Sequence, residues 1–178
     1  LHVGLTRLGM LTLRFGFPYA AQGRKRPDPP ALLERTFRAA ASALLTEPQA
    51  APARVFLGGI GLGAQVAARV LAQGHVADGL LCLAYPLHPS GKPNQARAEA
   101  LYRIICPMLF VQGSRDPYCR IDRLEAVLRR VGAPTVLHAV EDADHGLAPI
   151  KRSQRELDEV RAEILSTVES FVRKALGG

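Results

Sequence analysis

Strand-length apolar runs alternate along this chain with longer segments whose apolar residues recur at helical spacing, and this order constrains the fold most strongly. The apolar runs predict strands at 10–15, 54–58, 79–86, 106–113 and 134–140. The periodic segments predict helices at 33–45, 62–73, 96–102, 121–131 and 157–172, the first ending before Pro48. Parallel strands need crossover connections, and strands buried on both faces form unbroken apolar runs. We therefore expect an α/β fold with a doubly wound, mostly parallel sheet.

Length and composition indicate one ordinary globular domain. The chain has 178 residues, 48% hydrophobic and 22% charged, and we expect a single domain over 1–178. No apolar run reaches the roughly 18 to 20 residues that cross a bilayer, and residues 1–20 lack the pattern of a signal peptide. We therefore expect a cytoplasmic protein with no membrane partner. The chain begins at Leu1 and not at Met, which indicates either a processed start or a part of a longer chain.

Cysteine usage argues against a disulfide framework and against a zinc site. The chain has three cysteines, Cys82, Cys106 and Cys119, and no CxxC pair. We expect these thiols to be reduced and buried, and we expect no metal.

The net charge of +7 raises the question of a nucleic-acid partner. Basic clusters occur at 24–26 and 151–152, but most other basic residues alternate with acidic ones along the predicted helices. Aromatic residues make up 6% of the chain and do not interleave with the basic runs, as they would on a single-strand binding face. The charge pattern therefore does not favour nucleic-acid binding.

A glycine-rich loop joins the predicted strand at 54–58 to the helix after it, and two templates fit it. Gly59, Gly61 and Ala64 satisfy the G-x-G-x-x-[GA] pattern of dinucleotide-binding folds. However, that pattern normally opens its domain, and its ribose-binding acid normally ends the next strand. Here Asp78 precedes the next strand, on the wrong side to reach a cofactor.

The second template is G-x-S-x-G, the sharp strand-to-helix turn on which hydrolases display a nucleophile. Gly59 and Gly63 take the flanking positions, where small residues let the helix and the strand approach each other. Gly61 takes the serine position. The residue there is normally forced into a strained backbone conformation that glycine tolerates. Gly61 therefore preserves the turn and removes the nucleophile.

The second template also requires an acid and then a histidine after later strands. Asp116 follows the predicted strand at 106–113, and His145 follows the one at 134–140. Agreement at three strand ends in the required order favours a triad-derived role over a turn-forming aspartate and a solvated loop imidazole. Ser114 and Cys119 lie near Asp116 but have no elbow to expose them, which argues against either as a substitute nucleophile. Three other histidines lack any such context, and we expect them to be surface or packing residues: His75, His88 and His138.

Four segments resemble the α/β-hydrolase superfamily, and the resemblance covers essentially the whole chain. They are "LRFGFPYAAQGRKRPDP", "LCLAYPLHPSGKP", "PMLFVQGSRDP" and "EDADHGLAPIKRSQR". Within the superfamily the chain resembles the dienelactone-hydrolase-like predicted hydrolases, which include testis-expressed and histone-acetyltransferase-complex relatives. The resemblance implies ester, lactone, thioester or amide substrates and no cofactor. It also implies that His145 takes the proton of a serine, that Asp116 orients the imidazolium, and that the backbone N–H of Leu62 helps to hold the oxyanion.

The chain departs from that family at three places. Gly61 stands where a serine is expected, and Gly16 stands where an acidic residue is expected. We also expect the strands ahead of Leu11, with the glycine loop that helps to bind the oxyanion in this family, to be absent. In this family a further strand separates those that 10–15 and 54–58 match, so we expect either an N-terminally truncated sequence or direct pairing of these two strands.

Together these features predict a hydrolase-family protein of the ester, lactone or thioester type that is inactive or weakly active. A small acyl compound is the expected substrate or ligand. The alternatives are a non-catalytic binding or scaffold module and a dinucleotide-binding domain that uses Gly59, Gly61 and Ala64.

Overall fold

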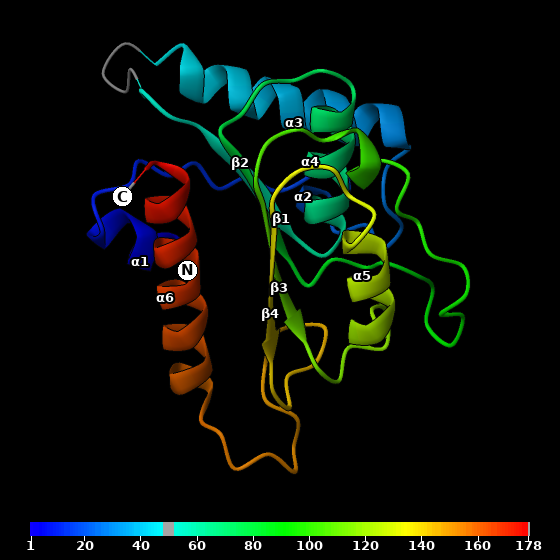
Figure 1. The fold of residues 1–178 in the computed structure, drawn as a ribbon. Helices are drawn as coiled ribbons and strands as arrows, with labels where there is room; N and C mark the ends of the chain where they lie inside the picture. The colour runs from blue at the N-terminus through cyan, green and yellow to red at the C-terminus, as the bar shows by residue number, and fades with distance from the viewer. Residues whose placement is uncertain (48–51, 178) are drawn as a thin grey trace.

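A computed structural model describes residues 1–47 and 52–177 and shows a four-stranded parallel sheet in the order β1-β2-β3-β4 (Figure 1). The strands are β1 (Phe56–Ile60), β2 (Gly79–Leu83), β3 (Met108–Gly113) and β4 (Thr135–Val140). The helices are α1 (His2–Arg7), α2 (Pro18–Ala21), α3 (Pro30–Leu45), α4 (Leu62–Ala72), α5 (Ile121–Leu128) and α6 (Leu157–Ala175), with a 3-10 turn at Leu101–Arg103. The expected doubly wound parallel sheet is confirmed, although it has only part of the expected strands.

Helices cover both faces of the sheet and divide the core into two layers (Figure 1). Helices α3, α4 and α5 pack on one face, and α6 with α1 packs on the other. Side chains of β3 alternate between the layers, as the two-residue period of a strand requires. Met108 and Phe110 face α4, whereas Leu109 and Val111 face α6. Every residue of β3 is buried, which explains its unbroken apolar sequence.

The longer helices begin and end where their sequences predict. Pro29 and Pro30 open α3, where a missing backbone N–H removes no intrahelical bond. In α6, Asp158 and Glu159 lie in the first turn, and basic residues lie in the last turn. Both placements interact favourably with the helix dipole, which is positive at the N-terminus and negative at the C-terminus. None of the helices in the described part of the chain is both long and apolar enough to span a membrane.

The prediction of a strand at 10–15 is wrong. This segment is irregular, and Leu11 and Leu13 are 58% and 48% exposed. Phe15 instead packs edge-on against Phe37 of α3. A β-favouring sequence forms a strand only where a ladder partner lies beside it, and this segment does not pair with β1. Of the two alternatives, direct pairing of these two segments is therefore wrong, and β1 is an edge of the described sheet.

The helix predicted near 96–102 is also wrong in extent, since only Leu101–Arg103 forms a helical turn. The sequence did not predict α1 and α2, which are too short to show a helical period. The end of α3 lies at Leu45, and Pro48, which was expected to follow it, lies outside the described residues.

The three cysteines are free thiols, as expected, but their burial differs. Cys82 and Cys119 are buried, whereas Cys106 is partly exposed. The expectation that all three would be buried is therefore wrong for Cys106, which precedes β3 and lies outside the strand that was predicted to include it.

Candidate functional site

A sharp turn joins β1 directly to α4, because Ile60 ends the strand and Leu62 begins the helix. Gly61 lies between them with φ 56° and ψ −121°, a conformation that side-chain-bearing residues rarely adopt. Its amide donates to the carbonyl of Leu83 at 2.9 Å, and its carbonyl accepts from the amide of Ala64 at 3.0 Å. The turn is therefore held by backbone hydrogen bonds and places position 61 at the carboxyl edge of the sheet.

The two flanking glycines have different roles. A Cβ on Gly59 would lie 2.5 Å from the amide nitrogen of Ala64 and closer still to the carbonyl carbon of Gly63, so no side chain fits there. A Cβ on Gly63 would meet nothing within 4 Å. The close approach of strand and helix thus requires glycine at position 59, and the expected packing requirement for a small side chain at position 63 is wrong.

Asp116 lies in the turn that follows β3, and its side chain is fully buried. Its Oδ1 accepts from the amide of Tyr118 at 2.8 Å, which is the turn-forming role that its sequence context also allowed. Its Oδ2 accepts from Gln112 Nε2 at 2.6 Å and pairs with His145 Nδ1 at 2.8 Å. The carboxylate therefore forms the turn and holds the imidazole at the same time.

His145 lies in the loop after β4 and faces the Gly61 turn. Its Nδ1 pairs with Asp116, so Nε2 is left on the side of the turn. A Cβ on Gly61 would lie 3.3 Å from His145 Nε2. The ring of Tyr118 packs against the imidazole with centroids 4.7 Å apart. The structure thus brings together the three positions that the strand-end pattern predicted: 61, 116 and 145.

The loop that carries His145 is shaped by acidic neighbours that do not pair with the imidazole. Asp144 Oδ1 accepts from the amides of Gly146 at 2.8 Å and Ala148 at 3.2 Å. Asp142 pairs with Arg115 at 3.2 Å, which ties this loop to the loop after β3. The alternative of a solvated histidine paired with its sequence neighbours therefore does not hold.

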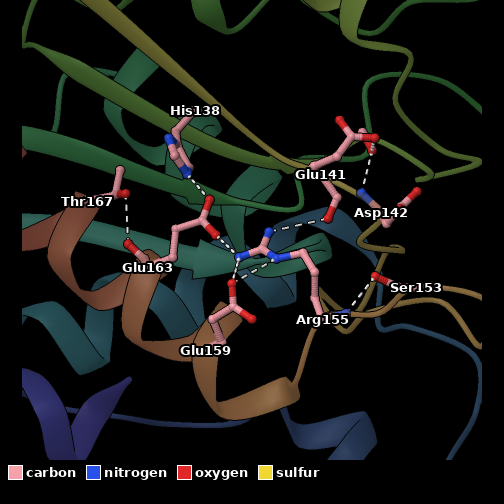
Figure 2. Close-up of polar contacts among 9 residues, drawn as sticks. His138, Glu141, Asp142, Ser153, Arg155, Glu159, Glu163 and Thr167 are labelled. Atoms are coloured by element: carbon pink, nitrogen blue, oxygen red, sulfur yellow. Dashed lines mark hydrogen bonds and ion pairs between the residues drawn. The ribbon is translucent and has the colours of Figure 1, made fainter.

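An ion-pair network anchors the same loop to α6 (Figure 2). Arg155 donates to the carbonyl of Glu141 at 3.4 Å and pairs with Glu159 and Glu163. His138 of β4, which was expected to be a surface or packing residue, pairs with Glu163 at 2.6 Å. Partial burial acts to raise the pKa of Glu163, but hydrogen bonds from Arg155 and His138 outweigh it and lower that pKa.

A second histidine fixes the loop after β3. His88 is 3% exposed, and its Nε2 accepts from the amide of Arg120 at 3.0 Å. Its Nδ1 lies 3.0 Å from the carbonyl of Pro89, which assigns the proton to Nδ1. His88 is therefore a packing residue, as expected, and it ties the loop after β2 to the segment that follows Asp116.

Neither substitute nucleophile is placed for attack. Ser114 Oγ accepts from the amide of Asp142 at 2.9 Å and donates to Glu141 Oε1 at 3.2 Å, so its hydroxyl is engaged between the two loops. Cys119 is 2% exposed. Burial first, and then the charge of Asp116, raise the pKa of Cys119 to about 12, so its thiol stays protonated at neutral pH.

The first turn of α4 lies next to Gly61 and offers free backbone donors. Leu62 is the first residue of α4, so its N–H has no intrahelical acceptor. Negative charge that developed at the turn would also meet the positive end of the helix dipole. The residue predicted to hold an oxyanion is thus in a position to donate.

Two findings bear on cofactors and metals. Asp78 lies before β2, where Oδ2 accepts from the amide of Val55 at 2.7 Å and Oδ1 pairs with Arg54 at 2.8 Å. These hydrogen bonds lower the pKa of Asp78 and hold it at the amino edge of the sheet, opposite Gly61. Within residues 1–47 and 52–177, no group of three or more His, Cys, Asp or Glu side chains could hold a metal ion.

Sequence reasoning missed Gln112, Tyr118 and Asp144. Of these three residues, only Gln112 had a feature in the sequence that could have identified it, because it is a polar residue at the end of an otherwise apolar strand. The contacts of Tyr118 and Asp144 depend on loop conformations that no local pattern encodes.

The fold is similar to that of several solved structures. A putative α/β hydrolase from Agrobacterium tumefaciens superposes with a TM-score of 0.71 at 17% identity, over 99% of this chain and 75% of that chain. An α/β serine hydrolase homologue from Coxiella burnetii superposes with a TM-score of 0.64 at 22% identity, over 80% of this chain and 64% of that chain. A dienelactone hydrolase from Anabaena variabilis superposes with a TM-score of 0.59 at 20% identity, over 81% of this chain and 60% of that chain.

These similarities establish the fold, and the chain spans between 60% and 75% of the length of these three structures. A family model described as an alpha/beta hydrolase domain matches residues 1–173, which includes the turn at Gly61 and the loops that carry Asp116 and His145. With almost the whole chain covered by that match, this protein belongs to the α/β-hydrolase domain family.

Proposed function

We propose that this chain is an ester-, lactone- or thioester-hydrolase-type domain that has lost the covalent route of hydrolysis. The observation that carries the proposal is the 3.3 Å between His145 Nε2 and the position of a Cβ on Gly61, because a serine hydroxyl would project from that carbon. The acid and the base remain paired at 2.8 Å. The site has therefore kept its proton-transfer pair and has no side chain to form an acyl-enzyme.

Any residual turnover runs through water. His145 Nε2 takes a proton from a water molecule as its oxygen attacks the acyl carbon, and the carbonyl becomes an oxyanion held by the Leu62 N–H. Asp116 stabilises the imidazolium that forms. The imidazolium then returns the proton to the leaving alcohol or thiol as the carbon–oxygen or carbon–sulfur bond breaks, which leaves a carboxylic acid. No cofactor takes part in these reaction steps.

Loss of a triad nucleophile costs several orders of magnitude in rate, so this chain is inactive or weakly active. Within the superfamily we assign it to the dienelactone-hydrolase-like group, on the residues of its strand-end loops. A small acyl compound is the expected ligand. The dinucleotide-binding alternative has no support from Asp78, which lies at the opposite edge of the sheet from Gly61.

The test is p-nitrophenyl acetate hydrolysis by the native chain, Gly61→Ser and Gly61→Ala. Serine should raise the rate about 100-fold or more with a burst of nitrophenol, because it restores the covalent route. Alanine carries the same backbone strain without a hydroxyl and should not raise it. The burst should disappear in Gly61→Ser combined with His145→Ala.

Two results would overturn the proposal. One is a Gly61→Ser protein that folds and shows no gain over Gly61→Ala, and the other is native turnover that persists unchanged in His145→Ala. A rise in thermal stability with NAD would favour the dinucleotide-binding alternative, whereas no response to either treatment would favour a binding or scaffold module.

A further inference from the structure

The orientation of the Gln112 amide is fixed by its neighbour. Gln112 is fully buried at the end of β3, and its Nε2 lies 2.6 Å from Asp116 Oδ2. The reverse orientation would place two acceptor oxygens at that distance, so the amide must donate. Its Oε1 is buried and has no hydrogen-bond partner among the described residues. One half of this amide is satisfied by Asp116, and the other half is left unsatisfied.

An unsatisfied buried carbonyl is unfavourable, and the surroundings of Gln112 offer an apolar alternative. The side chain projects to the same face of β3 as Met108 and Phe110, which are part of the apolar core. A methionine of similar length would fill that space without a polar atom to bury. Packing alone therefore does not account for an amide at this position, and its one hydrogen bond does.

The hydrogen bond reaches the oxygen that also holds His145. Asp116 Oδ2 accepts from Gln112 and from His145 Nδ1, whereas Oδ1 accepts from the amide of Tyr118. The three donors fix the plane of the carboxylate and hence the direction of the imidazole. Gln112 is uncharged, so it holds the carboxylate without neutralising it. The full negative charge stays available to an imidazolium at His145.

We propose that Gln112 is a positioning residue that orients Asp116 as the partner of His145 and keeps its charge for the imidazolium. This inference rests on the proposed roles of Asp116 and His145, but its test observes their geometry directly and needs no turnover. The other titratable group that faces Asp116 is the buried thiol of Cys119, which is neutral at physiological pH. The ring of Tyr118 contacts His145 and carries no charge.

The test follows the Nδ1–H proton of His145 in the downfield region of the proton NMR spectrum, in the native chain and in Gln112→Met. The native chain should show a slowly exchanging signal, because Asp116 holds this proton. In Gln112→Met the signal should broaden or shift as the carboxylate loses one donor, even if the protein becomes more stable. Gln73→Met is the matched control, since Gln73 Nε2 also donates to a carboxylate, Glu34, at 2.9 Å, at the exposed C-terminal end of α4.

Gln112→Glu allows a second test, in which the His145 signal of one folded variant is compared at different pH values. Two adjacent carboxyl groups share a proton, so the introduced carboxyl group can donate at low pH and repels Asp116 once both are ionised. The His145 signal should therefore be lost as pH rises in this variant and kept over the same range in the native chain. The proposal is overturned if the native chain shows no such signal, if Gln112→Met keeps it unchanged, or if Gln112→Glu shows no added pH dependence.

Discussion

Gly61 combines two properties at the scale of a single residue. Its φ of 56° is a conformation in which a side chain is strained, and a Cβ added to it would lie only 3.3 Å from His145 Nε2. Glycine relieves the strain and leaves no side chain for chemistry. The sequence could predict the turn because two glycines flank it and an apolar strand precedes it. It could not predict the distance to His145, which depends on the conformation of a loop that lies about 80 residues away in the chain.

Restoring a side chain at position 61 should lower stability. Gly61→Ser and Gly61→Ala should each reduce the free energy of unfolding by about 1–3 kcal/mol, because both place a Cβ at positive φ. Urea denaturation followed by circular dichroism measures this. An increase in stability with alanine, as at an unstrained glycine, would contradict the backbone conformation.

The two flanking glycines give a matched pair. Gly59→Ala should destabilise the protein by about 3 kcal/mol or more, because its Cβ would overlap backbone atoms of Gly63 and Ala64 that cannot move independently. Gly63→Ala should stabilise it by about 0.5–1 kcal/mol, because position 63 is helical and its Cβ would meet open space. Equal effects in urea denaturation would show that the strand and the helix do not approach as described.

At the scale of elements, the site depends on how three loops are held at one edge of the sheet. The loop after β3 and the loop after β4 approach so closely that a Cβ on Gly113 would overlap the carbonyl oxygen of Ala143. Arg155 then ties the second of these loops to the residues of α6. The strand ends could be predicted from apolar runs, which is why Asp116 and His145 could be identified. The contacts between the loops could not, because they join residues distant in sequence through single hydrogen bonds.

The Glu163 network should make stability depend on pH. The pKa of Glu163 is lowered in the folded protein, so its contribution is present above its unfolded value of about 4.5 and is lost as pH falls through the lowered value. Glu163→Gln should therefore destabilise the protein at pH 7, by about 1 kcal/mol or less for a partly exposed pair. The difference should shrink towards pH 3. Glu159→Gln is the control, because Glu159 is more exposed and its pairing with Arg155 should contribute less. An equal deficit at both pH values would contradict the assignment.

At the scale of the whole molecule, the parallel sheet could be predicted and its extent could not. Four of the five predicted strands form, since each is an apolar run that lies next to another strand. The run at 10–15 is also rich in apolar residues but lies outside the ladder, and composition carries no information on the presence of a partner. The three predicted triad positions converge in space because each follows the carboxyl end of a parallel strand. The roles of Gln112, Tyr118 and Asp144 depend on tertiary contacts that the sequence pattern does not encode.

The exposure of 10–15 has a measurable consequence. Leu13→Ser should change the free energy of unfolding by about 0.5 kcal/mol or less, because this side chain is 48% exposed outside the sheet. Leu109→Ala should cost about 2–5 kcal/mol, because Leu109 is fully buried in β3 between the sheet and α6. A large loss in Leu13→Ser would show that 10–15 does pair as a strand.

The missing side chain at Gly61 also bears on how far this chain is from a working triad. Some glycine and serine codons differ by one base, and His145 would need to move by only a few tenths of an ångström to admit a Cβ. The loops, the proton acceptor and the free amide of Leu62 would need no rebuilding. The proposed loss of the nucleophile is thus a reversible genetic step, and a single point mutation separates the present molecule from one with a serine beside a histidine that is already held in place.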